Sequence, residues 1–134
     1  MNKLSDPKKF ITAGKSIFTI RNEDNGNRFT FRVKKCEGKD IWFVGVLTGS
    51  DNTSHYSYIG TIFGKDFCVT QRSKFKKDDI KVIAFDWFWK RIQDGKLPEK
   101  LGVYHEGRCG RCGRRLTVPE SIESGFGPEC ITKL

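Results

Sequence analysis

The 134-residue sequence has no apolar run that approaches the roughly 18 residues of a membrane span. Its first nine residues lack the apolar stretch of a signal peptide, so we do not expect a secreted precursor. Five cysteines, an odd count, do not suit a disulfide framework. The sequence also contains no Walker loop, no HExxH motif and no pair of carboxylates at the spacing of a catalytic motif. We therefore expect that the protein is not an enzyme and has no small-molecule substrate. These absences predict a small cytoplasmic protein with reduced thiols and no membrane partner.

Basic side chains outnumber acidic ones. The chain has 25 Lys and Arg against 16 Asp and Glu, a formal net charge of +9. Residues 1–35 contain nine basic and three acidic side chains, and residues 71–104 contain nine and five. An uneven basic field favours polyanions or acidic protein surfaces as partners. The alternative is a solvated face that only keeps the protein soluble.

Strand patterns dominate the first half of the chain. The segment 28–34 alternates strictly, with Phe29, Phe31 and Val33 on one side and polar residues on the other. An Asn25-Gly26 turn before it predicts a hairpin. The segment 41–48 is apolar on both sides, which predicts a central strand covered on both faces. We expect strands at 16–21, 28–34, 41–48, 55–63 and 67–70.

The pattern then changes to a helical period. Asp78 or Asp79 can cap a helix that runs to about Asp94 and stops at Gly95. A broad apolar stripe predicts that this helix packs across the sheet, with Val82, Phe85, Trp89 and Ile92 at its centre and Ile83, Trp87 and Phe88 widening it. The predicted fold class is α+β: an antiparallel four- to five-stranded β-meander with one packed helix and a C-terminal zinc knuckle. We expect a flexible arm at 1–9, the meander and helix at 10–100, and a zinc-binding module at 101–134.

Three of the five cysteines lie close together near the C-terminus. Cys109 and Cys112 form a CxxC in which a glycine follows each cysteine, and Cys130 comes after seventeen intervening residues, behind a second glycine turn. Structural zinc prefers four tetrahedral ligands, and His105 is the nearest candidate for the fourth, giving a Cys₃His site. Glu106, Glu129 or an outside ligand are the alternatives. Free thiols without a metal, or a CxxC redox pair, are the competing interpretations.

The remaining cysteines and the nearby arginines allow simpler interpretations. Cys36 and Cys68 are expected to be small core or surface residues. Arginines crowd the CxxC, and they can either balance the charge of a zinc–thiolate centre or offer guanidinium forks to phosphate. The candidate residues for contact with nucleic acid or another partner are Arg28, Arg32, Lys34, Arg108, Arg111, Arg114 and Arg115.

The cysteine-rich tail, residues 109–130, resembles the C-x₂-C-G-R-x-L…S-I…G-x-G-P-x-C tail of a family of small uncharacterised phage and prophage proteins. The segments 46–54 and 85–89 are also similar to those proteins, so the resemblance extends from about residue 10 to residue 130. It implies a phage-encoded protein with a metal-binding C-terminus, made in the cytoplasm of a bacterial host. The resemblance does not indicate which activity the protein has.

Two functions follow as expectations. The first is a phage-encoded accessory protein that carries structural Zn²⁺ and binds DNA or RNA through a basic surface, because a sheet with basic and aromatic side chains can stack bases and follow phosphates. The second is a phage protein that binds a host enzyme or defence complex and inhibits or modifies it without catalysis.

Overall fold

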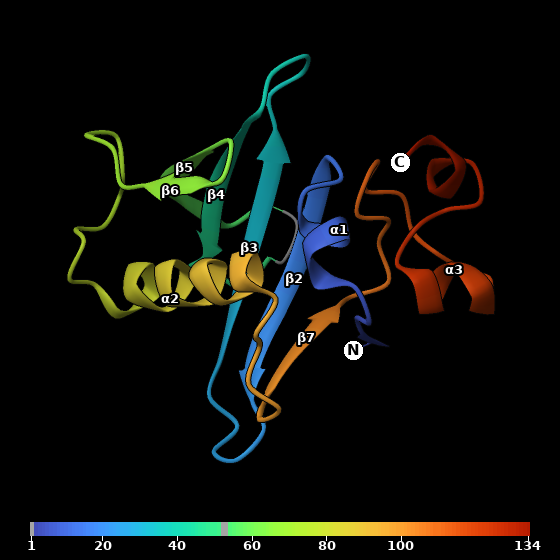
Figure 1. The fold of residues 1–134 in the computed structure, drawn as a ribbon, viewed down its shortest axis with the longest axis horizontal. Helices are drawn as coiled ribbons and strands as arrows, with labels where there is room; N and C mark the ends of the chain where they lie inside the picture. Colours follow the sequence, from blue (N-terminus) through green and yellow to red (C-terminus); the bar gives the residue numbers. More distant parts are fainter. Residues whose placement is uncertain (1, 52–53) are drawn as a thin grey trace.

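The computed structural model describes residues 2–51 and 54–134, and within them seven strands form one antiparallel sheet (Figure 1). The order across the sheet is β1-β7-β2-β3-β4-β5-β6. The α+β class is confirmed, with more strands than the four or five expected. The strands are β1 (Asn2–Lys3), β2 (Lys15–Asn22), β3 (Arg28–Lys35), β4 (Ile41–Leu47), β5 (Tyr56–Phe63), β6 (Asp66–Cys68) and β7 (Leu101–His105).

Strands β2 to β6 form the expected meander, in which each strand pairs with the next. In β3 the side chains of Phe31 and Val33 are fully buried, as the period-two alternation predicts. The β2–β3 hairpin closes through a bond from the Asn22 amide to the Asn27 carbonyl (2.8 Å), and Gly26 takes a φ of 73° in the turn. Glycine adopts this left-handed conformation without the steric cost of a Cβ.

Helix α2 (Ile80–Asp94) lies across one face of the sheet, and its C-terminal end is in front of β3 in Figure 1. The Asp79 carboxylate caps it by accepting from the Lys81 amide (2.9 Å), and Gly95 ends it in the left-handed conformation. The rings of Phe85 and Phe31 lie 5.1 Å apart between helix and sheet. The predicted central stripe of the helix is buried, and so is Phe88, one of the three residues expected to widen it; the buried side chains are Val82, Phe85, Phe88, Trp89 and Ile92.

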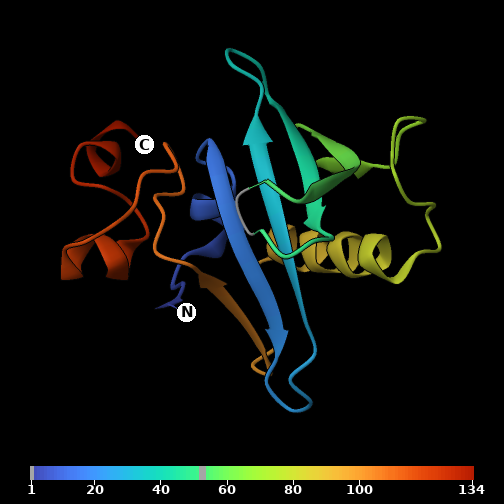
Figure 2. The ribbon, with the colours of Figure 1, turned by 180° about the vertical axis from the view of Figure 1, so that it is seen from behind.

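Two sequence expectations about covered faces are wrong. Ile83 and Trp87, expected to widen the packed stripe of α2, are 47% and 39% exposed because the sheet contacts a narrower side of the helix. Strand β4 is covered on one face only, and its Phe43 is 46% exposed. In Figure 2 no helix lies in front of β2, β3 or β4, although part of the β4–β5 connection crosses in front of β2 and β3. We call this side of the sheet the open face.

The expected boundaries at residues 9 and 100 are also corrected. Residue 1 lies outside the described residues, and residues 2–9 do not form a flexible arm: Asn2–Lys3 pairs with β7, and Leu4 is buried with its amide bonded to the Val103 carbonyl (2.7 Å). Helix α1 (Pro7–Ile11) follows. Strand β7 lies between β1 and β2 inside the sheet, so the C-terminal part separates from the sheet only after His105.

The rest of the C-terminal segment contains helix α3 (Pro119–Ser124) and the 3₁₀ helix η1 (Cys130–Lys133). We call residues 106–134 the cysteine module. It lies beside β7 and α1, away from α2 (Figures 1 and 2). Among the described residues, every helix is too short or too polar to cross a membrane.

The aromatic contact between α2 and the sheet generates a stability prediction. Phe88 is fully buried, with its ring 5.8 Å from that of Phe18. We expect Phe88→Ala to lower the free energy of unfolding by about 3–5 kcal/mol, because a buried ring is lost and a cavity remains. On the same helix, Ile83→Ala should cost less than about 1 kcal/mol, because its side chain is largely exposed. Urea denaturation followed by circular dichroism measures both, and equal losses would contradict the packing described.

Candidate metal centre

The CxxC lies in a tight turn between two short antiparallel segments. Arg108 and Arg115 pair as an isolated bridge. Inside it, the Cys109 amide donates to the Arg114 carbonyl (2.8 Å) and the Gly113 amide to the Cys109 carbonyl (2.9 Å). Gly113 has a φ of 78°, which a side chain would strain. This backbone geometry sets Cys109 and Cys112 on the same side of the turn.

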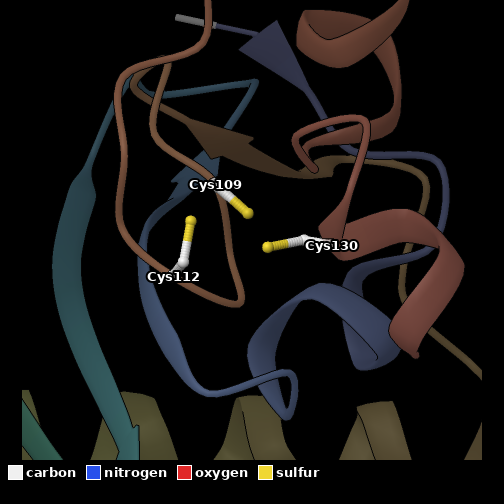
Figure 3. Close-up of side chains that lie close together, drawn as sticks. All are labelled: Cys109, Cys112 and Cys130. Atoms are coloured by element: carbon white, nitrogen blue, oxygen red, sulfur yellow. The ribbon is translucent and has the colours of Figure 1, made fainter.

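The third cysteine comes from the opposite end of the module. Gly125 ends α3 with a φ of 81°, and its carbonyl accepts from the Gly110 amide (3.0 Å), which ties the two ends together. Cys130 then begins η1. Figure 3 shows the three thiols pointing toward one another, and their sulfur atoms all lie within 4.8 Å of each other. The structure therefore brings together three of the four predicted ligands.

The sulfur spacing suits a metal ion. With Zn–S bonds of about 2.3 Å, tetrahedral ligands lie roughly 3.8 Å apart, so sulfurs within 4.8 Å need only a small contraction. Two donors already face the sulfurs: the Gly127 amide lies 3.4 Å from Cys109 Sγ, and Arg111 Nη1 lies 3.5 Å from Cys130 Sγ. Donors of this kind stabilise thiolates, the form of cysteine that binds metals.

The pKa values of the CxxC thiols are shifted in opposite directions. Burial raises the pKa of Cys109, but the backbone amides of Gly127, Cys112 and Arg111 outweigh it, so that pKa lies below its ordinary value. The pKa of Cys112 lies above its ordinary value, chiefly because burial disfavours its thiolate. Cys109 is therefore the more readily deprotonated of these two thiols.

His105 is not the fourth ligand in this structure, which corrects the Cys₃His prediction. Its Nε2 lies 2.6 Å from the Ile122 carbonyl, and its Nδ1 accepts from the Gly107 amide at 3.0 Å. These bonds define a neutral ring with the proton on Nε2. Burial lowers the pKa of His105, which favours that neutral form. The side chain is a buried link between β7 and α3.

The other candidate residues lie around the cluster or away from it. Among the described residues, only the three cysteines form a close group of metal-ligating side chains, and the Glu129 carboxylate stays outside it although Glu129 lines the adjoining cavity. Cys68 is exposed and Cys36 partly exposed, and both lie apart from the group. Arg111 contacts Cys130, so part of its role is to balance thiolate charge.

Phe10 supports the centre and was not found by sequence reasoning. Its ring is fully buried, 5.8 Å from that of Phe126. A Cβ at Gly110 or at Gly125 would lie 2.6 Å or 2.8 Å from Phe10 Cδ2. Gly110 therefore follows Cys109 because a side chain would collide with Phe10, whereas Gly113 follows Cys112 because the turn there needs a positive φ. The one available signal was the apolar pair that ends α1, Phe10-Ile11.

Comparison with known proteins yields one similarity. Residues 99–134 match a family of unknown function, DUF6011, and this range covers β7 and the entire cysteine module. No curated protein and no solved structure shows significant similarity to the chain.

Measuring the metal bound by variants can distinguish the proposed ligands from the residues that only support them. We expect Cys112→Ser to lower the bound metal well below one ion per chain, because a thiolate donor is lost. His105→Gln should keep about one ion per chain, because the imidazole binds backbone groups only. Cys68→Ser, at an exposed thiol outside the cluster, is the matched control. Elemental analysis of purified protein gives the stoichiometry, and loss of metal from His105→Gln with correct folding would restore the histidine as a ligand.

Proposed function

We propose that the protein is a zinc-binding accessory protein that binds single-stranded nucleic acid, DNA or RNA, on the open face of its sheet. The observation that carries this proposal is a row of cations interspersed with aromatic side chains on that face. The resemblance of the tail to phage proteins supports a phage-encoded protein that acts in the cytoplasm of a bacterial host.

The cations follow from the alternation in β3. Because Phe31 and Val33 face α2 and are buried, Arg28, Arg32 and Lys34 extend from the opposite side of the strand. Six residue steps separate the first cation from the last, roughly 20 Å at about 3.3 Å per residue. This length is sufficient for contacts with several consecutive phosphates.

The neighbouring strand β2 widens the basic row. Arg21 lies opposite Arg28, and Lys15 lies opposite Lys34. Residues directly opposite in an antiparallel pair extend from the same face of the sheet. Like charges in these positions repel one another, and a bound polyanion relieves that repulsion.

Aromatic side chains lie among these cations. Phe43 of β4 is opposite Lys34 and 46% exposed, so its ring offers a surface on which a base can stack. The Arg32 guanidinium lies 4.9 Å from the centre of the Tyr56 ring. Burial raises the pKa of Tyr56 to about 12, and the Glu106 carboxylate adds to the shift. Tyr56 therefore stays neutral at physiological pH and repels no phosphate.

Carboxylates near the open face moderate its charge without cancelling it. Glu23 accepts a hydrogen bond from Tyr104 Oη at 2.6 Å, which holds it at the end of the sheet. Glu106 and Asp51 both raise the pKa of Tyr56, so their charges lie near its hydroxyl. The β2–β3 cations outnumber these three acids.

The basic row continues into the cysteine module. A Cβ on Gly113 would lie 3.9 Å from Lys15 Cβ, and Arg108 Nη1 donates to the Gly113 carbonyl at 3.3 Å. The end of β2 thus adjoins the CxxC turn and its arginines. This continuity supports one binding surface that joins the two groups of basic residues predicted from the sequence.

Zinc is the metal that suits the module best. Soft thiolate ligands select zinc, copper(I) or iron–sulfur clusters, and a CxxC turn with tetrahedral spacing is typical of zinc. The module buries few apolar side chains, namely those of Cys109, Leu116, Phe126 and Cys130. A metal ion bonded to cysteines at both ends of the module would supply folding stability that this small apolar core does not provide.

Binding of a host protein is the second candidate function. Ile80, Ile83 and Trp87 are spaced to lie on one side of α2, and all three are exposed. Exposed apolar side chains that adjoin one another favour contact with another protein. In a pull-down from nuclease-treated host lysate, loss of one stoichiometric partner from Ile83→Lys, with nucleic-acid binding unchanged, would favour this function.

The salt dependence of binding tests the basic row. We expect Arg28→Ala/Arg32→Ala to weaken binding of a labelled oligothymidylate and to reduce the slope of log affinity against log salt by about 1.4, roughly 0.7 for each phosphate that is no longer neutralised. Lys90→Ala/Lys96→Ala removes the same charge at and just beyond the C-terminal end of α2. Fluorescence anisotropy between about 50 and 200 mM NaCl measures both. Absence of binding at the lowest salt, or equal losses in both pairs, would refute the proposed face.

The exposed ring on the open face allows a separate test of base stacking. We expect Phe43→Ala to weaken single-strand binding about 5- to 100-fold, because a stacked base is worth roughly 1–3 kcal/mol. The salt slope should stay the same, because no charge is removed. Trp87→Ala, an aromatic substitution on α2 away from the open face, is the control. An unchanged affinity for Phe43→Ala would show that no base stacks on this ring and that phosphate contacts account for the binding.

A further inference from the structure

A cavity of about 440 Å³ adjoins the cysteine cluster. All three cysteines line it, together with Arg111, Arg114, Arg115 and Glu129. Its volume falls within the roughly 300–1,000 Å³ of small-ligand pockets, so it holds more than a single water molecule. The cavity therefore joins a candidate metal position to a group of arginines.

The three thiolates leave one tetrahedral position without a donor. Among the described residues, no fourth His, Cys, Asp or Glu side chain joins their group. Both ring nitrogens of His105 are bonded to backbone groups, and Glu129 lines the cavity without reaching the cluster. Structural zinc sites have four protein ligands, whereas sites with three leave a position for another molecule.

The charges around that position favour an anion. Three thiolates and one divalent ion sum to −1, and Glu129 adds another negative charge. Arg111, Arg114 and Arg115 supply three positive charges on the cavity wall. Guanidinium groups bind the oxygen atoms of phosphate with paired, charge-assisted hydrogen bonds. A phosphate group thus fits both the vacant metal position and the wall beside it.

We propose that the fourth metal position opens on this cavity and accepts an oxygen atom of an exogenous phosphate group, held by Arg114 and Arg115 with support from Arg111. This inference rests on the proposed metal centre and not on nucleic-acid binding by the sheet. The step is a ligand exchange, in which a phosphate oxygen replaces a solvent molecule and no electrons are transferred. The phosphate can be a free ion or the terminal phosphate of a nucleic acid.

Cobalt(II) substitution of the full-length protein tests the proposal, because the visible spectrum of cobalt(II) responds directly to its ligands. Inorganic phosphate is titrated first. A 5′-phosphorylated oligonucleotide and the same sequence with a 5′-hydroxyl follow. We expect phosphate to change the spectrum saturably. A response to the phosphorylated oligonucleotide alone would identify a nucleic-acid end as the source, and a response to phosphate alone would identify the free ion.

Matched arginine variants locate the binding group. We expect Arg114→Ala to weaken the phosphate response about tenfold and Arg114→Lys to restore it only in part, because lysine lacks the planar fork. With inorganic phosphate as the probe, Arg108→Ala is the control: it removes the same charge from the CxxC turn, but Arg108 does not line the cavity, and its Nη1 donates to Gly113. Cobalt content should remain about one ion per chain in all three variants.

The outcomes distinguish this inference from the proposed function. A cobalt spectrum that no phosphate probe changes would overturn it and indicate a closed site. Equal weakening by Arg114→Ala and Arg108→Ala would also overturn it, because the cavity would then not be the binding site. Failure of the wild-type chain to take up metal would overturn both the metal centre and this inference. A phosphate response without oligothymidylate binding would refute the nucleic-acid function and leave this inference standing.

Discussion

The packing of Phe10 joins the two parts of the molecule. Its ring lies 5.6 Å from that of His105 at the end of β7 and 5.8 Å from that of Phe126 in the cysteine module. Gly110 and Gly125 approach the ring so closely that neither has room for a side chain. Because these glycines lie in or near the segments that contain the three clustered cysteines, this one ring sets the position of the cysteine turn against the sheet. Because protein interiors are close-packed, a small displacement of one side chain is passed on to the side chains in contact with it.

Local periodicity predicted the elements whose partners are close in sequence. The alternation in β3 and the stripe on α2 each contain several apolar residues, enough to reveal their period. Strands β1 and β7 could not be found this way, because β1 has two polar residues and the pairing partners of β7 are about eighty to one hundred residues away. Their pairing is a long-range contact, which no window along the chain contains. For the same reason the predicted boundary at residue 100 fell just before β7, which belongs to the sheet.

The structure brings the three predicted cysteines together and leaves His105 outside their group, and both outcomes have a physical reason. A CxxC turn sets the relative position of its own thiols, so its spacing carries geometric information. The distance from His105 to Cys109 along the chain carries none about the ring, whose two nitrogens are bonded to Gly107 and Ile122. The apolar side chains on both sides of β4 were equally misleading, because Phe43 is exposed among cations. Composition alone cannot distinguish a strand that is covered on both faces from one that leaves an aromatic side chain exposed to solvent.

The adjacency of β2 and the CxxC turn means that a metal ion held by the three cysteines would also influence the electrostatics of the basic surface. The Lys15 amide donates to the Gly110 carbonyl at 2.9 Å, so the basic end of β2 is hydrogen-bonded to the turn that holds Cys109 and Cys112. Arginines on a turn without a metal would sample many orientations, because the module has little apolar core of its own. An ion bonded to cysteines from both ends of the module would hold the same arginines in a defined direction beside the lysines of the sheet. In the proposed function, such an ion would order charges that a flexible tail could not hold in place.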